Sequence, residues 1–120
     1  MKGDDTDLSI IFIMRIRKNT DQAEEADIEL IASVSDALAH PVRLKLFRHI
    51  MKANRSMQQV CNGDLVNEFG YAQATISQHM QKLVKAGLVS TKKQNKYTYY
   101  YANPGMLMKY IDNTKKYSII

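Results

Sequence analysis

Amide and hydroxyl side chains cluster between residues 73 and 78, and lysines follow them between residues 82 and 96. Amides and hydroxyls can hydrogen-bond the edges of nucleic-acid bases, and ammonium groups can neutralise phosphates. The candidates on a predicted helix are Gln73, Thr75, Ser77, Gln78 and Lys82, and the candidates on a predicted hairpin are Lys92, Lys93 and Lys96. These residue types at this spacing favour contact with a polyanion.

The charge distribution supports the same interpretation. The net charge is +5, yet residues 1–60 carry nine Lys or Arg against nine Asp or Glu. The excess therefore lies in the second half, where no carboxylate occurs between Glu68 and Asp112. Such an asymmetry indicates a surface that faces nucleic acid. A lysine-rich face that serves only solubility is the alternative.

Several of these side chains also have simpler roles open to them. Thr75 and Ser77 could cap or hydrogen-bond their own helix instead of DNA. His79 lies next to an apolar stripe, which favours a structural histidine or a phosphate contact over a ligand role. Ser77 and His79 lack a partner that would orient a base, and the basic half has no glycine-rich phosphate loop or paired carboxylates. We therefore do not expect an enzyme.

Glycine, proline and turn-forming residues mark the boundaries of the elements that position these residues. A short helix is predicted from about residues 62–64 to Phe69, ended by Gly70, and a second from residue 73 to Gly87. Residues 88–93 and 96–102 read as two strands joined by a turn at Gln94 and Asn95. A last helix follows from Pro104 to about Lys116. The predicted class is mainly α with a small β-hairpin, a winged helix-turn-helix.

The N-terminal half is less clearly patterned. Residues 1–7 read as a frayed tail, and the β-branched run Ser9–Arg17 is ambiguous, with a strand or an arm against a partner subunit favoured. Helices are predicted from Asp21 and from Pro41. The buried face of the second is predicted to consist of Leu44, Phe47, Ile50 and Met51. We expect an arm at 1–20 and one domain at 21–120.

Two stretches resemble ArsR/SmtB-type winged-helix repressors. Residues 35–44, SDALAHPVRL, are similar to the opening of that family, and residues 73–89, QATISQHMQKLVKAGLV, resemble its recognition helix and the exit into the wing. The resemblance implies a homodimer, joined mainly by the first and last helices, that binds an operator to repress transcription. We expect an interface formed by Ile28, Ile31, Met108 and Ile111.

The metal sites that the resemblance brings with it are incomplete in this sequence. Cys61 matches the first cysteine of one family site, but Gly63 stands where the second would be. Asp112 is the only potential ligand of a second site on the last helix. We therefore expect no metal and no other cofactor. Cys61 remains a candidate redox switch, with a small buried hydrophobe as the favoured alternative.

The predicted partners are double-stranded DNA and a second copy of the chain, with no membrane. A single cysteine and the shortness of the apolar run at Leu8–Met14 favour the cytoplasm. The second half contains no arginine, the usual partner of guanine, whereas glutamine pairs with adenine. This predicts an A·T-rich inverted repeat. The alternative is a winged-helix module that contacts a protein through the Tyr97–Tyr101 strand and no longer binds DNA.

Overall fold

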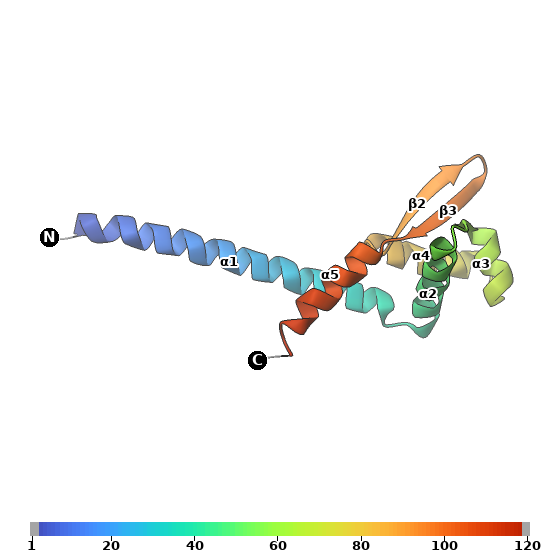
Figure 1. Ribbon diagram of the computed structural model, residues 1–120, viewed down its shortest axis with the longest axis horizontal. Helices are drawn as coiled ribbons and strands as arrows, with labels where there is room; N and C mark the ends of the chain where they lie inside the picture. Colours follow the sequence, from blue (N-terminus) through green and yellow to red (C-terminus); the bar gives the residue numbers. More distant parts are fainter. Residues whose placement is uncertain (1–2, 119–120) are drawn as a thin grey trace. The chain divides into compact units, whose positions relative to one another are not determined.

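The structure is a computed structural model that describes the backbone of residues 3–118 and the side chains of residues 10–11 and 21–118. Its elements follow in the order α1 (Gly3–Leu38), α2 (Pro41–Arg55), β1 (Val60–Cys61), α3 (Asn62–Phe69), α4 (Gln73–Lys85), β2 (Val89–Gln94), β3 (Tyr97–Ala102) and α5 (Pro104–Lys115) (Figure 1). The chain divides into two compact units, Met1–Leu30 and Ile31–Ile120. The predicted class, mainly α with a small hairpin, is confirmed.

The first unit is the N-terminal part of α1, and it corrects the prediction for the start of the chain. The strand favoured for Ser9–Arg17 is wrong, because this run is helical, and the helix begins at Gly3 rather than at Asp21. An arm against a partner subunit stays a prediction. No glycine or proline interrupts the chain between residues 4 and 38, so nothing stops the helix from continuing. The side chains of residues 12–20 lie outside the described residues, so the role of the apolar run stays a prediction.

Local signals define the start of α2. The His40 side chain accepts a hydrogen bond from the Val42 backbone N–H at 3.2 Å, and Pro41 occupies the first helical turn as predicted. Arg43 reaches back to the end of α1, where its Nε donates to the Ala37 carbonyl at 2.7 Å and its Nη2 to the Asp36 carbonyl at 3.0 Å. These bonds satisfy carbonyls that a helix end leaves without partners.

The core of the second unit lies between α2, α3 and α4. Its largest fully buried side chains are Leu46 and Ile50 of α2, Leu65 of α3, Ile76, Met80 and Leu83 of α4, and also Leu88 and Val34. The predicted face of α2 is partly wrong, because Leu44 is 50% exposed and Met51 is only half-buried. The helix instead turns Leu46, Phe47, Ile50 and Ala53 inward, a stripe that also has three- and four-residue steps.

The three strands form an antiparallel sheet in the order β1-β3-β2. The β2–β3 hairpin matches the predicted pair of strands within one residue, and Asn95 adopts a left-handed φ of 57° in its turn. The two-residue strand β1 was not predicted, and it pairs Val60 with Tyr100 and Cys61 with Tyr99. The sheet therefore joins the start of α3 to the wing.

The end of the chain returns to α1. Asn103 begins α5 by accepting a hydrogen bond from the Met106 backbone N–H at 3.3 Å. Within the second unit, the Ser35 and Tyr110 hydroxyls hydrogen-bond each other at 2.8 Å, which links the end of α1 to α5. Among the helices that the structure describes, none has the length and apolarity to cross a membrane.

Candidate nucleic-acid interface

The pair of helices α3 and α4 forms the predicted helix-turn-helix. Gly70 ends α3 with a left-handed φ of 74°, which costs glycine little, and its N–H donates to the Val66 carbonyl at 2.9 Å. Gly87 follows α4 with a φ of 79° and leads into the hairpin. Because both glycines stand at these turns, the chain places a short helix, a second helix and a wing in close succession. This order confirms the predicted arrangement.

Helix α4 is amphipathic, with one buried apolar side and a polar surface. Ile76, Met80 and Leu83 are buried in the core, which fixes the side that faces the protein. The remaining surface is polar: Gln73, Gln78 and Lys82 are exposed, and Thr75 is half-buried. An α-helix fits the major groove of B-DNA, so exposed amides on such a helix can reach base edges. Three of the five predicted contact residues on α4 are thus exposed, and the other two are half-buried.

Ser77 is half-buried like Thr75, and its hydroxyl has a hydrogen-bond partner within the protein. Its Oγ accepts a hydrogen bond from Asn62 Nδ2 at 3.1 Å, and the same amide group donates to the Tyr100 hydroxyl at 3.2 Å. Asn62 therefore joins α3, α4 and β3 at one point. The Asn62 Oδ1 atom is buried without a hydrogen-bond partner. A DNA contact by Ser77 stays a prediction, because its hydroxyl already has an internal bond.

One further exposed amide of α4 was not among the predicted contacts. Gln81 is exposed and lies three positions after Gln78, so the two amides share a face of the helix. The i, i+3 spacing of two glutamines was the signal that could have found it. We add Gln81 to the candidates for DNA contact.

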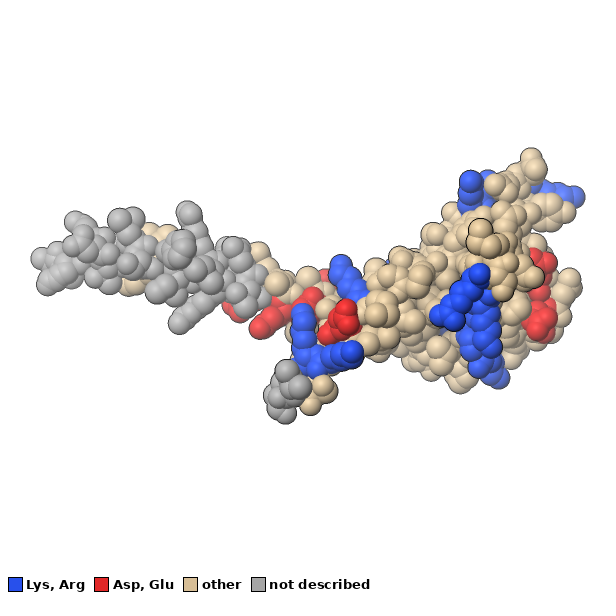
Figure 2. All heavy atoms as spheres, in the orientation of Figure 1, with Lys and Arg blue, Asp and Glu red and all other residues tan. Residues whose placement is uncertain are grey.

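The wing carries the second predicted group of contacts. Lys92, Lys93 and Lys96 are all exposed. In the strand register, Lys92 lies opposite Tyr99 and Lys93 opposite Thr98, so the first two lysines project from opposite faces of the hairpin. The Lys96 ammonium lies 5.5 Å from the centre of the Tyr97 ring. The lysines of the wing are visible at the tip of the hairpin (Figure 2).

The tyrosines of β3 alternate between the two faces of the strand. Tyr100 is 6% exposed and packs inward, whereas Tyr97, Tyr99 and Tyr101 share the opposite face. The rings of Tyr97 and Tyr99 lie 6.3 Å apart, and the Tyr101 hydroxyl accepts a hydrogen bond from Gln59 Nε2 at 3.2 Å. The wing is therefore tied to the rest of the domain through Tyr100 and Tyr101, and Tyr97 is the exposed member of the four.

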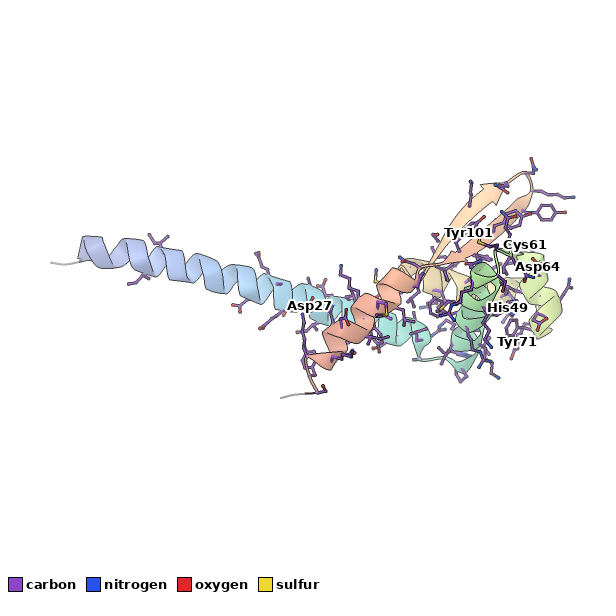
Figure 3. All side chains as sticks on the ribbon, in the orientation of Figure 1. Asp27, His49, Cys61, Asp64, Tyr71 and Tyr101 are labelled. Atoms are coloured by element: carbon purple, nitrogen blue, oxygen red, sulfur yellow. The ribbon has the colours of Figure 1, made fainter. Side chains whose placement is uncertain are left out.

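Cys61 and Asp64 lie together at the start of α3 (Figure 3). The Cys61 backbone N–H donates to Asp64 Oδ2 at 2.9 Å, so this carboxylate caps the helix. Cys61 is partly exposed and forms no disulfide. In the part of the chain that the structure describes, no three His, Cys, Asp or Glu side chains are grouped so that they could hold a metal. Metal independence and the redox role of Cys61 both stay predictions.

His79 of α4 contacts the start of α2. Its ring centre lies 4.7 Å from that of His40, at an angle of 48°. Desolvation by burial lowers the pKa of His79 below its usual value of 6.5, and His40 and Arg43 lower it further by charge repulsion. The structure thus favours a neutral His79, in keeping with the structural role weighed for it.

This lowered pKa predicts how acid affects stability. The unfolded chain binds a proton at His79 more readily than the folded chain does, so the stability that the neutral ring provides is present above about pH 6.5 and is lost as the pH falls through the lowered pKa. We expect the difference in free energy of unfolding between wild type and His79→Gln to decrease on acidification. Chemical denaturation between pH 8 and pH 5 measures it, and a difference independent of pH would contradict the assignment.

Comparisons with known proteins agree with this geometry. Residues 40–91 match the model of the family described as bacterial regulatory protein, arsR family. An HTH-type transcriptional regulator of Methanocaldococcus jannaschii, MJ1325, is 33% identical over 73 residues, which cover 61% of this chain and 78% of that protein. The chain belongs to the ArsR family. ArsR proteins are DNA-binding transcriptional regulators. Contact of α4 and the wing with DNA stays a prediction.

Two NolR proteins extend the likeness beyond the helix-turn-helix. The nodulation protein NolR of Rhizobium meliloti is 30% identical over 83 residues, 69% of this chain, and the matched part spans 64% of the length of NolR. The crystal structure of NolR from Sinorhizobium fredii superposes with a TM-score of 0.59 at 30% identity, and covers 80% of this chain and 89% of that one. The winged-helix fold of an ArsR protein is therefore shared over most of the chain.

Proposed function

We propose that the chain is a dimeric repressor that binds an A·T-rich inverted repeat in double-stranded DNA without a metal cofactor. The observation that carries this proposal is the exposure of Gln73 and Gln78 on α4, in a half of the chain that contains no arginine. Glutamine forms a bidentate pair with adenine, whereas guanine is most often read by arginine. Amides as the exposed base readers therefore favour A·T pairs.

The dimer is supported by apolar side chains that the fold leaves accessible. Ile28 of α1 is 47% exposed and Met108 of α5 is 56% exposed, and the nearby Ile31 and Ile111 are half-buried. Large apolar side chains on helix surfaces often mark an interface. A two-fold dimer would present two copies of α4 to successive turns of the same DNA face, which is why we expect an inverted repeat.

The absence of a metal response is supported by the residues at the start of α3. The Asp64 carboxylate accepts a hydrogen bond from the Cys61 backbone N–H and so caps α3. The position two residues after Cys61 is Gly63, which has no side-chain ligand atom. A soft-metal site needs two or more thiolates or imidazoles at fixed spacing. The single cysteine also agrees with a cytoplasmic repressor, because one thiol gives no intrachain disulfide.

Selection of bound sequences from a randomised duplex tests the proposal. We expect half-sites rich in A·T pairs, in inverted orientation, with centres about 10–11 base pairs apart or a multiple of that spacing. The Gln78→Ala variant should lose discrimination at one or two positions of each half-site, by roughly 1–3 kcal/mol per base pair, and keep its overall salt dependence.

Other outcomes of the selection would contradict the proposal in distinct ways. Half-sites rich in G·C pairs would exclude Gln73 and Gln78 as the main readers. Enrichment of single half-sites would argue against the two-fold dimer. A chain that forms no salt-sensitive complex with any duplex would instead favour the protein-binding module that presents the Tyr97–Tyr101 strand.

A further inference from the structure

Helix α2 carries a strongly one-signed charge. Residues 41–55 contain five Lys or Arg and no carboxylate, whereas residues 19–40 contain six Asp or Glu and no Lys or Arg. Neither stretch is part of the surface expected to bind DNA. An acidic helical segment thus precedes a basic helix in the same chain, and the two carry complementary charges.

A groove of about 570 Å³ runs along the outer face of α2. It is lined by the apolar residues Leu38, Pro41, Leu44, Phe47, Met51 and Leu107 and by the cations Lys45, Arg48, Lys52 and Arg55. No carboxylate is among these lining residues. Lysine and arginine side chains form a band over α2, with uncharged surface beside it (Figure 2). The groove therefore fits a partner that carries a row of apolar side chains beside a row of acidic side chains.

The acidic part of α1 has this character. Ile28 is 47% exposed, and the exposed acids Asp21, Glu24 and Glu25 precede it by seven, four and three residues. Positions at these steps lie on the same face of a helix. One face of the segment therefore presents an apolar side chain followed by acids on the side toward the N-terminus.

We propose that the α2 groove receives residues 21–28 of α1 from a second copy of the chain. On α2, the cations Arg48 and Lys52 follow Leu44 by four and eight residues, so the order of apolar and charged groups is the reverse of that on α1. Antiparallel docking with Ile28 on Leu44 places Glu24 beside Arg48 and Asp21 beside Lys52. The inference rests on the dimer proposed above and gives it a contact beyond the apolar residues of α1 and α5.

The two kinds of contact have different effects. Burial of Ile28 against Leu44 and its apolar neighbours contributes affinity, as in other complexes in which an amphipathic helix binds a groove. Because the hydrophobic effect is non-directional, this burial does not determine the orientation of the helix. The ion pairs determine the register and orientation, because a like-charge juxtaposition is unfavourable. Since these pairs lie at the rim, salt should weaken the contact.

Charge reversal in two separate copies tests this contact. Glu24→Lys and Arg48→Glu each place like charges together at both of the equivalent contacts in a symmetric dimer. We expect each variant alone to dimerise at least about tenfold more weakly than wild type at low salt. An equimolar mixture restores opposite charges at both contacts, so the mixed dimer should form within about threefold of the wild-type dissociation constant. Analytical ultracentrifugation without DNA measures all three.

The controls separate this contact from the rest of the proposed function. Lys85→Glu at the end of α4 reverses a cation that is also exposed and should leave dimerisation unchanged. A mixture that recovers no more dimer than its components, or single variants that dimerise like wild type, would overturn the contact in trans. Recovery only when both substitutions are in the same chain would show pairing within one copy. If wild type stays monomeric at micromolar concentration, the dimer itself is overturned, and operator binding is then measured separately.

Discussion

Replacing Lys92 and Lys93 with glutamine is expected to weaken binding of the selected operator by about a thousandfold at roughly 0.1 M salt. If three or four lysines per copy contact phosphates, the dimer releases counterions from six to eight phosphates, and the log–log salt slope is roughly −5 to −7. Because the two lysines project from opposite faces of the hairpin, we expect the wing to enter a groove of DNA with one lysine toward each strand. The double variant then removes four contacts from the dimer, so the slope should fall in magnitude by roughly 4. Titration of the operator at several salt concentrations gives both quantities.

A matched pair on α5 controls for the loss of net charge. Lys109→Gln with Lys115→Gln removes the same number of exposed lysines from a helix that is not expected to meet DNA. This variant should keep the wild-type slope within about one unit, because a remote charge releases no bound counterion. Equal slopes for the two double variants would mean that the wing does not contact phosphates, even if both bind more weakly than wild type.

Much of the DNA-binding half could be predicted because its signals are local. Gly70, Gly87 and Asn95 adopt left-handed conformations at the three turns where their residue types indicated a break. Between these turns, Ile76, Met80 and Leu83 form the buried stripe of α4 at four- and three-residue steps, a spacing that is visible in the sequence. Short-range stereochemistry thus determines the order of helix, turn, helix and wing.

The errors lie where no local signal decides. A β-branched run such as Ile10, Ile11 and Ile13 suits a strand or a buried helix equally. Only the absence of glycine and proline from residues 4–38 favours its continuation into α1. Strand β1 depends on the pairing of Val60 with Tyr100, residues 40 positions apart. In α2, two apolar stripes were available, and the choice between Leu44 and Leu46 is made by packing rather than by spacing.

The same distinction applies to the candidate site. The exposure of Gln73 and Gln78 followed from amphipathic spacing, whereas the internal hydrogen bond of Ser77 required Asn62 and Tyr100 to meet from two other elements. The contact between His40 and His79 likewise joins two helices that are far apart in the sequence. Residue type indicates which side chains can bind DNA, and tertiary packing decides which of them already form hydrogen bonds within the protein.

Leu65→Ala is expected to lower the free energy of unfolding by about 2–5 kcal/mol. Leu65 is fully buried with 0% exposure, and it is the side chain through which α3 packs into the core. Its truncation removes apolar contacts and leaves a cavity that the close-packed neighbours in α4 can fill only in part. Urea denaturation at a fixed protein concentration measures the change, which is a large fraction of the stability of a small domain.

Met57→Ala serves as the control for this truncation. Met57 is 92% exposed, and alanine at its left-handed φ of 62° introduces no strain that methionine does not already have. Surface substitutions of this kind usually change stability by less than about 0.5 kcal/mol. Because α3 supports α4 through the core, Leu65→Ala should also weaken operator binding under conditions where the chain remains folded, whereas Met57→Ala should not. If Leu65→Ala keeps the wild-type free energy of unfolding, the packing of α3 does not depend on this side chain. The support of α4 would then have to come from the hydrogen bonds of Asn62.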